Sequence, residues 1–255
     1  MSFNIRYHNR DFPPGDPDYW PDREPLLKAM LEDQRPHLLG TQEVLFHQLS
    51  ALRAGLPDHD YVGYGRGGGS VQEHVPVFFD PERLELTAWD QRWLSDTPML
   101  INSKTWGNTL PRVLVRCDFT DRLTGAEFTF INTHLDHESE LARVNGARQI
   151  ACLATEADRP VIVTGDMNAT AESSQAWQVL TDAGLLDTWL SAEQRLSDAT
   201  STWHGYHQPT PQGNRIDWIL ASPAIRASST KINNWTLGGR WPSDHLPVQV
   251  ELVIG

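Results

Sequence analysis

The sequence predicts a fold that combines helices and strands (α/β in the broad sense, α+β in the strict one). Two mostly antiparallel or mixed sheets are expected to pack face to face, with helices on their outer sides. Short β-rich runs outnumber the helix-like runs and do not alternate strictly with them, which excludes a simple barrel of βα units. Continuous apolar runs such as Val161–Val163 are typical of strands covered on both faces. Alternating runs such as Arg112–Phe119 indicate strands with one wetter face.

The elements can be placed in order along the chain. The runs expected to form strands are Phe3–Tyr7, His37–Gly40, Val75–Phe79, Leu84–Leu94, Arg112–Phe119, Glu127–Thr133, Val161–Thr164, Arg215–Ala221 and Val248–Ile254. The runs expected to form helices are Arg23–Gln34, Gln42–Gly55, Glu140–Ala157 and Ser173–Ala183. In the third helix, apolar residues from Leu141 to Ala154 recur at helical spacing, and Gly184 after the fourth favours a helix end.

The connections between these elements are long in four places, around residues 8–22, 65–74, 95–111 and 200–214. Loops of this length in a compact domain usually form functional rims. No low-complexity tract or long charge run marks a linker, so a single domain over residues 1–255 is expected.

Charge and apolar run length limit what the protein can bind. Lys and Arg total 21 against 33 Asp and Glu, so the formal net charge is −12. A surface this negative repels a polyphosphate backbone unless a basic patch or a bound cation intervenes. No apolar run is long enough to cross a membrane. We expect no membrane partner and no duplex-wide nucleic-acid surface, and we expect a monomer.

The N-terminal residues and the cysteines indicate the compartment. MSFNIRY lacks the basic-then-apolar pattern of a signal peptide, so a cytoplasmic location is expected, with an upstream segment as the open alternative. Cys117 and Cys152 make neither a disulfide framework nor a cysteine-rich metal site. Both lie in apolar contexts, so two small buried thiols are expected.

Polar side chains recur where the expected strands end. They are Asn4, Glu43, His134, Asp166, Asn168, Asp217, Asp244 and His245. A carboxylate there is costly unless it finds a hydrogen bond, a cation or a metal, so these positions indicate one convergent site. Oxygen ligands without thiolates favour Mg²⁺, with Mn²⁺ as a substitute, over zinc. The histidines lack a close metal-binding spacing and suit acid–base work better, and the whole set is suited to phosphoester hydrolysis.

Each motif taken alone has a simpler interpretation. Gly165–Asn168 would be a turn about as readily as a site, and Ser243–His245 would more often be a helix or strand cap. His134 alone would more often be a hydrogen-bonded structural histidine. The occurrence of all the motifs in one chain, in this order, favours a site.

The ordered set SFNIRY, GTQE, NTHLDH, GDMNA, RIDWIL and SDHLPV resembles the endonuclease/exonuclease/phosphatase superfamily. The resemblance runs from residue 3 to about residue 250. It implies a deoxyribonuclease I-like fold, a four-layered α-β-β-α sandwich with its site at one edge. The motifs are specific for fold and reaction but only weakly specific for substrate.

The resemblance also implies roles for the residues that bind metal and water. Asn4 and Glu43 match metal-site positions, and Asp244 matches a third carboxylate beside them. Asp166 and Asn168 match the pair that orients water and holds the transition-state phosphate.

The two imidazoles have their own counterparts in the family. His245 matches the second catalytic imidazole, with Asp217 as its orienting partner or as an alternate metal ligand. His134 matches the branch that uses histidine rather than tyrosine at this position. Glu73 falls where that branch keeps a glutamate to orient the imidazole, and an ordinary loop carboxylate is the alternative.

The residues assigned to substrate binding lie in stretches of sequence that are less characteristic of the family. Arg112 resembles an arginine that contacts the scissile phosphate, with surface pairing as the alternative. Arg143 would reach the rim of the site or else lie on a solvated helix face. His137 could be mistaken for a zinc partner of His134, but no third ligand follows, so a rim residue is expected. Trp203 is a further substrate-binding candidate.

The substrate class follows from what surrounds these motifs. The loops are poor in Lys and Arg but rich in aromatic residues: Tyr19, Trp20, Trp106, Trp203, Tyr206 and Trp241. Aromatic rings can stack on a base or a sugar, or can simply close a cavity rim. The chain resembles compact bacterial members of the family, and the sequences of its motifs are most similar to those of the deadenylase-like branch.

We therefore expect a Mg²⁺-dependent phosphoesterase for a phosphodiester or phosphomonoester, on a small molecule or a short single-stranded nucleic acid. The alternative is a metal-dependent endonuclease or exonuclease acting on DNA or RNA. A catalytically inactive binding module is least favoured, because a degenerate scaffold would have lost some of the residues named above.

Overall fold

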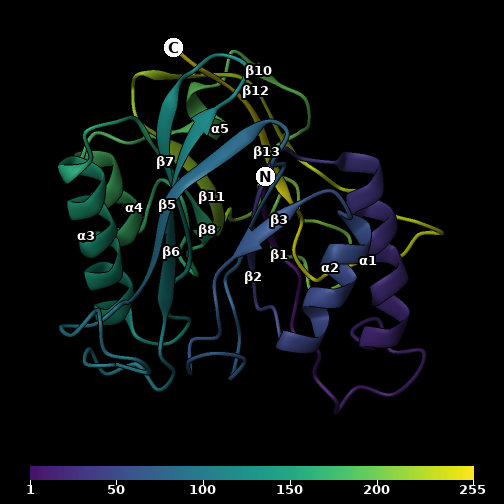
Figure 1. The fold of residues 1–255 in the computed structure, drawn as a ribbon. Helices are drawn as coiled ribbons and strands as arrows, with labels where there is room; N and C mark the ends of the chain where they lie inside the picture. Colours follow the sequence, from purple (N-terminus) through teal and green to yellow (C-terminus); the bar gives the residue numbers. More distant parts are fainter.

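Two sheets face each other, and helices cover the outer side of each (Figure 1). The computed structural model describes all of residues 1–255. Helices α1 (Trp20–Gln34) and α2 (Leu49–Gly55) cover one sheet, and α3 (Glu140–Glu156) and α4 (Gln175–Asp182) cover the other. The predicted α-β-β-α sandwich is confirmed.

The first sheet has seven strands in the order β10-β12-β13-β1-β2-β4-β3. Their bounds are β1 Ser2–Asn4, β2 Leu38–Gln42, β3 Asp60–Val62, β4 Val77–Phe79, β10 Gln194–Arg195, β12 Ile225–Ile232 and β13 Val248–Ile254. The sheet is mixed, because β1 pairs parallel with β2 and β10 with β12, whereas the other neighbours are antiparallel.

The second sheet has six strands in the order β5-β6-β7-β8-β11-β9. Their bounds are β5 Leu84–Trp93, β6 Val113–Asp121, β7 Glu127–His134, β8 Val161–Asp166, β9 Leu186–Asp187 and β11 Asp217–Ala221. Only β7 and β8 are parallel, and α3 provides the crossover between them. A short helix, α5 (Thr188–Ser191), follows β9.

Strand alternation divides the core into layers. On β8, Val161 and Val163 point toward α3 and α4, whereas Ile162 points into the space between the sheets. Such strands are covered on both faces, which explains why they read as continuous apolar runs. The layer between the sheets includes several aromatic side chains, among them Phe79, Phe119 and Phe128.

Two predicted elements are shorter than expected because of left-handed residues. The strand predicted over Phe3–Tyr7 ends at Asn4, and Arg6 has φ 57°. The helix predicted over Gln42–Gly55 is wrong in its first half, because Gln42 ends β2 and Glu43 has φ 61°. An α-helix cannot include a residue at that φ. A 3₁₀ turn over Phe46–Gln48 then leads into α2.

Other differences come from weak patterns. Strands β3, β9, β10 and β12 and helix α5 were not predicted. Most of them are two to four residues long, and β12 is rich in small polar residues. Cys117 is buried as predicted, but Cys152 is exposed, because it lies on the outer side of α3. Within the structure, no helix combines the length and the apolar character needed to span a bilayer.

Candidate active site

A polar cavity of about 480 Å³ opens at the end of the sandwich where β1, β2, β7 and β8 end. Most of the predicted site residues line it: Glu43, Glu73, Arg112, His134, Asp166, Asn168, Trp203, Asp244 and His245. Asn4 and Asp217 lie beneath this lining and contact it through hydrogen bonds. Arg143 does not line the cavity. The structure therefore brings together every predicted site residue except Arg143.

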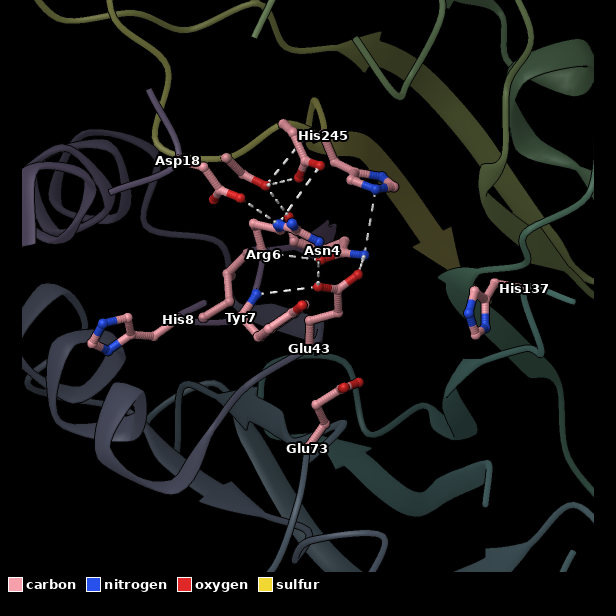
Figure 2. Close-up of polar contacts among 12 residues, drawn as sticks. Asn4, Arg6, Tyr7, His8, Asp18, Glu43, Glu73, His137 and His245 are labelled. Carbon is pink, nitrogen blue, oxygen red and sulfur yellow. Dashed lines mark hydrogen bonds and ion pairs between the residues drawn. The ribbon is translucent and has the colours of Figure 1, made fainter. Parts of the chain in front are cut away.

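Asn4 connects the two sheets at the floor of the cavity. Its Nδ2 donates to Glu43 Oε1 at 2.8 Å and to Asp166 Oδ2 at 2.9 Å, so one amide holds a carboxylate from each sheet. Its Oδ1 accepts from the backbone N–H of Arg6 at 2.9 Å. Tyr7 N–H donates to Glu43 Oε2 at 3.1 Å, as Figure 2 shows. Asn4 thus orients Glu43, which was predicted to hold a metal, and Asp166, which was predicted to orient water.

Two groups of side chains are close enough to hold an ion. Ligand atoms of Glu43, His134 and Asp166 lie within 4.8 Å of one another, and so do those of Asp166, Asp217 and His245. Asp166 belongs to both groups. Oxygen-rich donor sets of this kind suit Mg²⁺ or Mn²⁺.

The electrostatics of Asp166 also fit a cation. The carboxylate is buried, and its burial together with the neighbouring Asp217 raises its pKa, although His245 opposes this. Asp217 Oδ1 is buried and has no hydrogen-bond partner. Negative charge at this point is therefore incompletely compensated by the protein itself, which is what a cation site requires.

Asp244, predicted as a third metal carboxylate, belongs to neither group. Its Oδ2 accepts from Trp203 Nε1 at 3.2 Å and lies 4.0 Å from Arg6 Nε. Its Oδ1 accepts from the hydroxyl of Ser243 at 3.3 Å. Asp244 therefore lies on the cavity wall in contact with positive and neutral donors.

His245 is held as a cation. Its Nδ1 lies 2.9 Å from Asp217 Oδ2, as predicted, and its Nε2 lies 3.8 Å from Asp166 Oδ2. Burial alone would lower the pKa of His245, but the carboxylates of Asp217 and Asp166 outweigh it and raise the pKa well above its usual value. The imidazolium therefore has a proton on each nitrogen near neutral pH.

His134 is held neutral, and its Nε2 lies 3.6 Å from the same oxygen, Asp166 Oδ2. Burial, and then the guanidinium groups of Arg112 and Arg66, lower its pKa well below the usual value. Asn168 Nδ2 lies 2.9 Å from His134 Nε2 and also donates to the carbonyl of Leu135, so we assign Nε2 as the acceptor. The two imidazoles of the site thus differ in charge, because His134 is neutral and His245 is cationic.

Glu73 is close to His134 but does not hydrogen-bond to it. Its Oε2 lies 4.0 Å from His134 Nδ1, while its Oε1 accepts from Arg66 Nη2 at 2.7 Å. Arg66 was not predicted as a site residue. It lies in the glycine-rich loop, and only the folded chain shows that it pairs with Glu73.

Arg112 is buried in the wall and has a free donor. Its Nε lies 3.4 Å from Asp136 Oδ2 and its Nη2 lies 2.8 Å from His137 Nδ1. Its Nη1 is buried without a hydrogen-bond partner. A guanidinium N–H in that state is ready for an oxyanion. Arg143 contacts the same loop through the carbonyl of Asp136, outside the cavity.

The rim differs from the predicted ring of aromatic side chains. Trp203 lines the cavity with 55% of its surface exposed, and His137 lies on the rim as predicted. Of the other aromatic loop residues that were predicted, none lines the cavity. Tyr7 does so instead, directly after the first motif.

Comparisons with known proteins agree with this geometry. The model of the endonuclease/exonuclease/phosphatase family matches residues 1–245. The chain belongs to this family. Hydrolysis of phosphoester bonds, predicted from the motifs, is therefore supported as the general class of activity.

Among solved structures, a mannosyl-6-phosphatase of Bacteroides thetaiotaomicron is 31% identical, with a TM-score of 0.90 over 99% of this chain and 98% of that one. A family protein from Bacteroides vulgatus is 29% identical, with a TM-score of 0.91 over 100% and 97%. TDP2 of D. rerio with a single-strand DNA product is 16% identical, with a TM-score of 0.72 over 99% and 97%, and shows the shared fold alone.

A search of curated proteins found an uncharacterized protein of Acanthamoeba polyphaga mimivirus. It is 26% identical over 162 residues, which are 58% of this chain. The chain matches only 59% of the length of that protein.

Proposed function

We propose that this protein is a Mg²⁺-dependent phosphoesterase that removes the phosphate from a small sugar phosphate or a similar phosphomonoester. The observation that carries the proposal is the pair of imidazoles beside Asp166 Oδ2, of which His134 is neutral and His245 is cationic. A pair of groups whose pKa values are driven apart in one site supplies a base and an acid at the same pH.

The residues of the site divide the reaction between them. Glu43 and Asp166 would hold the ion, which neutralises phosphate charge and polarises a phosphoryl oxygen when bound. Neutral His134 takes a proton from the attacking water as its oxygen bonds to phosphorus. Cationic His245 gives its Nε2 proton to the ester oxygen as the bond from phosphorus to that oxygen breaks.

Two side chains hold the phosphate during this displacement. The unpartnered Nη1 of Arg112 donates to a non-bridging oxygen, and the Asn168 amide turns from His134 to a second oxygen. Donors that strengthen as charge develops on these oxygens stabilise the transition state. Asp217 keeps the His245 ring in place through its hydrogen bond to Nδ1.

The size and charge of the cavity support a small substrate. A volume of about 480 Å³ is within the range of sites for single small molecules. No lysine lines the cavity, and both lining arginines, Arg6 and Arg112, already contact carboxylates. The mannosyl-6-phosphatase with 31% identity over almost the full length of both chains supports a sugar as the phosphorylated group.

The second candidate is a nuclease for short single-stranded nucleic acid. The exposed ring of Trp203 favours it, because a base can stack on an aromatic ring at the mouth of a site. The cavity lining contains no Lys or Arg beyond Arg6 and Arg112, which is less favourable to a long polyanion, because such a ligand needs a row of cations.

Phosphate release tests the proposal directly. We expect Mg²⁺-dependent release from hexose 6-phosphates and none from single-stranded oligonucleotides. Arg112→Gln should raise KM at least about tenfold, because it removes a charge-assisted donor. Arg122→Gln is the matched control, since Arg122 pairs with Glu85 on the surface, and it should behave like the unaltered protein.

Two outcomes would contradict the proposal. Full activity after exhaustive chelation would exclude the metal. Cleavage of oligonucleotides without phosphate release from any monoester would establish the nuclease instead.

A further inference from the structure

Arg6 lies at the site because of a sharp left-handed turn directly after β1. Its φ of 57° is unusual for a residue with a side chain, and its N–H donates to Asn4 Oδ1. Its carbonyl accepts from Arg23 Nη1 at 3.3 Å and from Gln48 Nε2 at 3.2 Å. The backbone of Arg6 is therefore fixed on both sides, and the residue lines the cavity. Strained backbone of this kind is concentrated at functional positions.

The guanidinium of Arg6 is surrounded by three carboxylates. Its Nε lies 2.9 Å from Asp18 Oδ2 and 4.0 Å from Asp244 Oδ2, and its Nη1 lies 3.8 Å from Glu43 Oε2. Figure 2 shows these contacts radiating from Arg6 toward Asp18 and Glu43. Its side chain is 22% exposed, so the charge is fixed and still faces the cavity.

Asp18 anchors this arrangement from outside the cavity. One of its oxygens accepts from the hydroxyl of Tyr206 at 2.9 Å and lies 3.2 Å from Nη2 of the fully buried Arg23. Asp18 thus fixes the guanidinium of Arg6 without being part of the cavity lining. A guanidinium held by several partners at once keeps its position better than a flexible surface side chain.

The place of Arg6 bears on how many ions the site takes. Both groups of side chains that are close enough to hold an ion include Asp166, and neither includes Asp244. Asp244 and one oxygen of Glu43 instead lie beside a positive charge that is already present. A second divalent ion between Glu43 and Asp244 would be repelled at close range by the guanidinium.

We propose that Arg6 is a built-in cation of the active site, which limits the site to one divalent ion. Its guanidinium supplies, beside Glu43 and Asp244, the positive charge that a second ion would otherwise bring to the phosphate. Asp244 then serves to hold Arg6 and Trp203 rather than to bind metal. This inference rests on the proposed metal-dependent function.

Mn²⁺ binding followed by electron paramagnetic resonance tests it without any assay of activity. We expect the unaltered protein to bind one Mn²⁺ per chain, with no spin coupling. Arg6→Gln should bind a second Mn²⁺ that couples to the first, and Arg6→Lys, which keeps the charge, should bind one. Arg10→Gln is the matched control, because it removes the same charge from an exposed position in the following loop.

Inorganic phosphate provides a second readout. In the presence of Mn²⁺, calorimetry should show phosphate binding at least about tenfold more weakly to Arg6→Gln than to Arg10→Gln, because a charged donor is lost. Thermal unfolding of each variant checks that it is folded.

The outcomes separate this inference from the proposed function. Two ions bound by the unaltered protein would overturn it, and this measurement needs no variant. A single uncoupled ion in folded Arg6→Gln, with unchanged phosphate affinity, would also overturn it. If the unaltered protein binds no Mn²⁺ at all, the proposed metal-dependent function is wrong.

Discussion

The two ends of the space between the sheets differ, although the same strands build both. On β7 the residues that point into this space are Phe128, Phe130, Asn132 and His134, in that order. One end therefore has an apolar cavity of about 310 Å³ lined by the two phenylalanines, and the other has the polar cavity of about 480 Å³. The neighbouring strand β8 changes from apolar to polar in the same way, because Ile162 lines the apolar cavity and Asp166 lines the polar one.

The presence of a cavity alone does not indicate a functional site, because both ends have one. At the apolar end the charged groups are paired, since Asp121 accepts from Arg83 Nε at 2.9 Å and from Nη2 at 2.7 Å. At the polar end buried groups remain without partners, including Asp217 Oδ1 and Arg112 Nη1. Unmet polar groups lower stability, so a buried carboxylate oxygen and a buried guanidinium nitrogen without partners at the polar end indicate binding of something else there.

A polar layer separates the two ends. Asn132 accepts from Gln42 Nε2 at 2.7 Å and donates to the carbonyl of Thr41 at 2.9 Å, so it joins β7 of one sheet to β2 of the other. Glu43 follows directly after β2, and His134 ends β7. This layer therefore sets the distance between the two halves of the site.

The largest expected effect on turnover comes from removing the uncompensated charge at the polar end. Asp166→Asn should lower turnover by at least about 10²-fold, because it removes a metal-binding oxygen next to both imidazoles. The same change should raise the stability of the metal-free protein at pH 8 by roughly 1 kcal/mol, since the raised pKa of Asp166 makes its ionised form unfavourable.

Asp121→Asn is the matched change at the apolar end. Arg83 holds the pKa of Asp121 below its usual value, so this substitution should lower stability by on the order of 1 kcal/mol and leave turnover unchanged. Urea unfolding and steady-state kinetics of both variants measure the contrast. Equal stability changes in the two variants would contradict the difference drawn between the two ends.

A core truncation at the apolar end should act on stability alone. Phe130→Ala is expected to cost about 3–5 kcal/mol, because Phe130 is 2% exposed in the layer between the sheets. Turnover per folded molecule at low temperature should remain near normal. Phe130 lies four positions before His134 on the extended strand β7, in the lining of the opposite cavity. A loss of turnover larger than the loss of folded protein would show that the two ends are not independent.

The polar layer offers a change that should affect both properties. A Cβ at Gly40 would lie 2.5 Å from Asn132 Oδ1 and 2.6 Å from Thr164 Oγ1. Gly40→Ala should therefore cost about 1–3 kcal/mol and lower turnover roughly tenfold by shifting Glu43 against His134.

Gly184→Ala serves as the control for Gly40→Ala. Gly184 has φ 93° and open space around it, so the substitution costs backbone strain without touching the site. Kinetics of the two variants at matched fractions folded compare them. Normal turnover in Gly40→Ala would mean that the polar layer does not position the two halves of the site.

Much of this arrangement could be predicted from the sequence. Residues that end buried strands lie at one edge of a sandwich, and so Glu43, His134, Asp166 and His245 were expected to converge, as they do. The continuous apolar run Val161–Val163 also indicated that this strand is covered on both faces, as it is.

The remainder depends on contacts between distant residues, which local patterns do not contain. Arg6 follows Asn4 in the first motif, but only the fold places Asp18 and Asp244 against it. The left-handed φ of Glu43 excludes a helix at the position where the sequence pattern predicted one to begin. Most of the apolar residues predicted to face the core from helix α3 do so, although Leu141 is exposed. Arg143 on the same helix pairs with Glu140 beside the site rather than in it.

The smallest expected effect is a pH dependence confined to the polar end. His74, next to Glu73, is 2% exposed, and its burial lowers its pKa although its Nδ1 lies 3.0 Å from the carbonyl of Val44. As pH falls below about 6.5, the unfolded chain takes a proton at this residue before the folded chain does, so folding is opposed until the lowered pKa is reached. Above about pH 6.5 the residue is neutral in both states, so it does not make stability depend on pH. The stability of the unaltered protein relative to His74→Gln should therefore fall between pH 6.5 and 5.5, by at most about 1.4 kcal/mol per pH unit. Asp121→Asn should shift the curve by a constant over the same range, because the lowered pKa of Asp121 confines its own slope to values below about 3.9. Urea unfolding of the metal-free proteins across this range is the measurement, and parallel curves for the unaltered protein and His74→Gln would show that His74 takes its proton equally in both states.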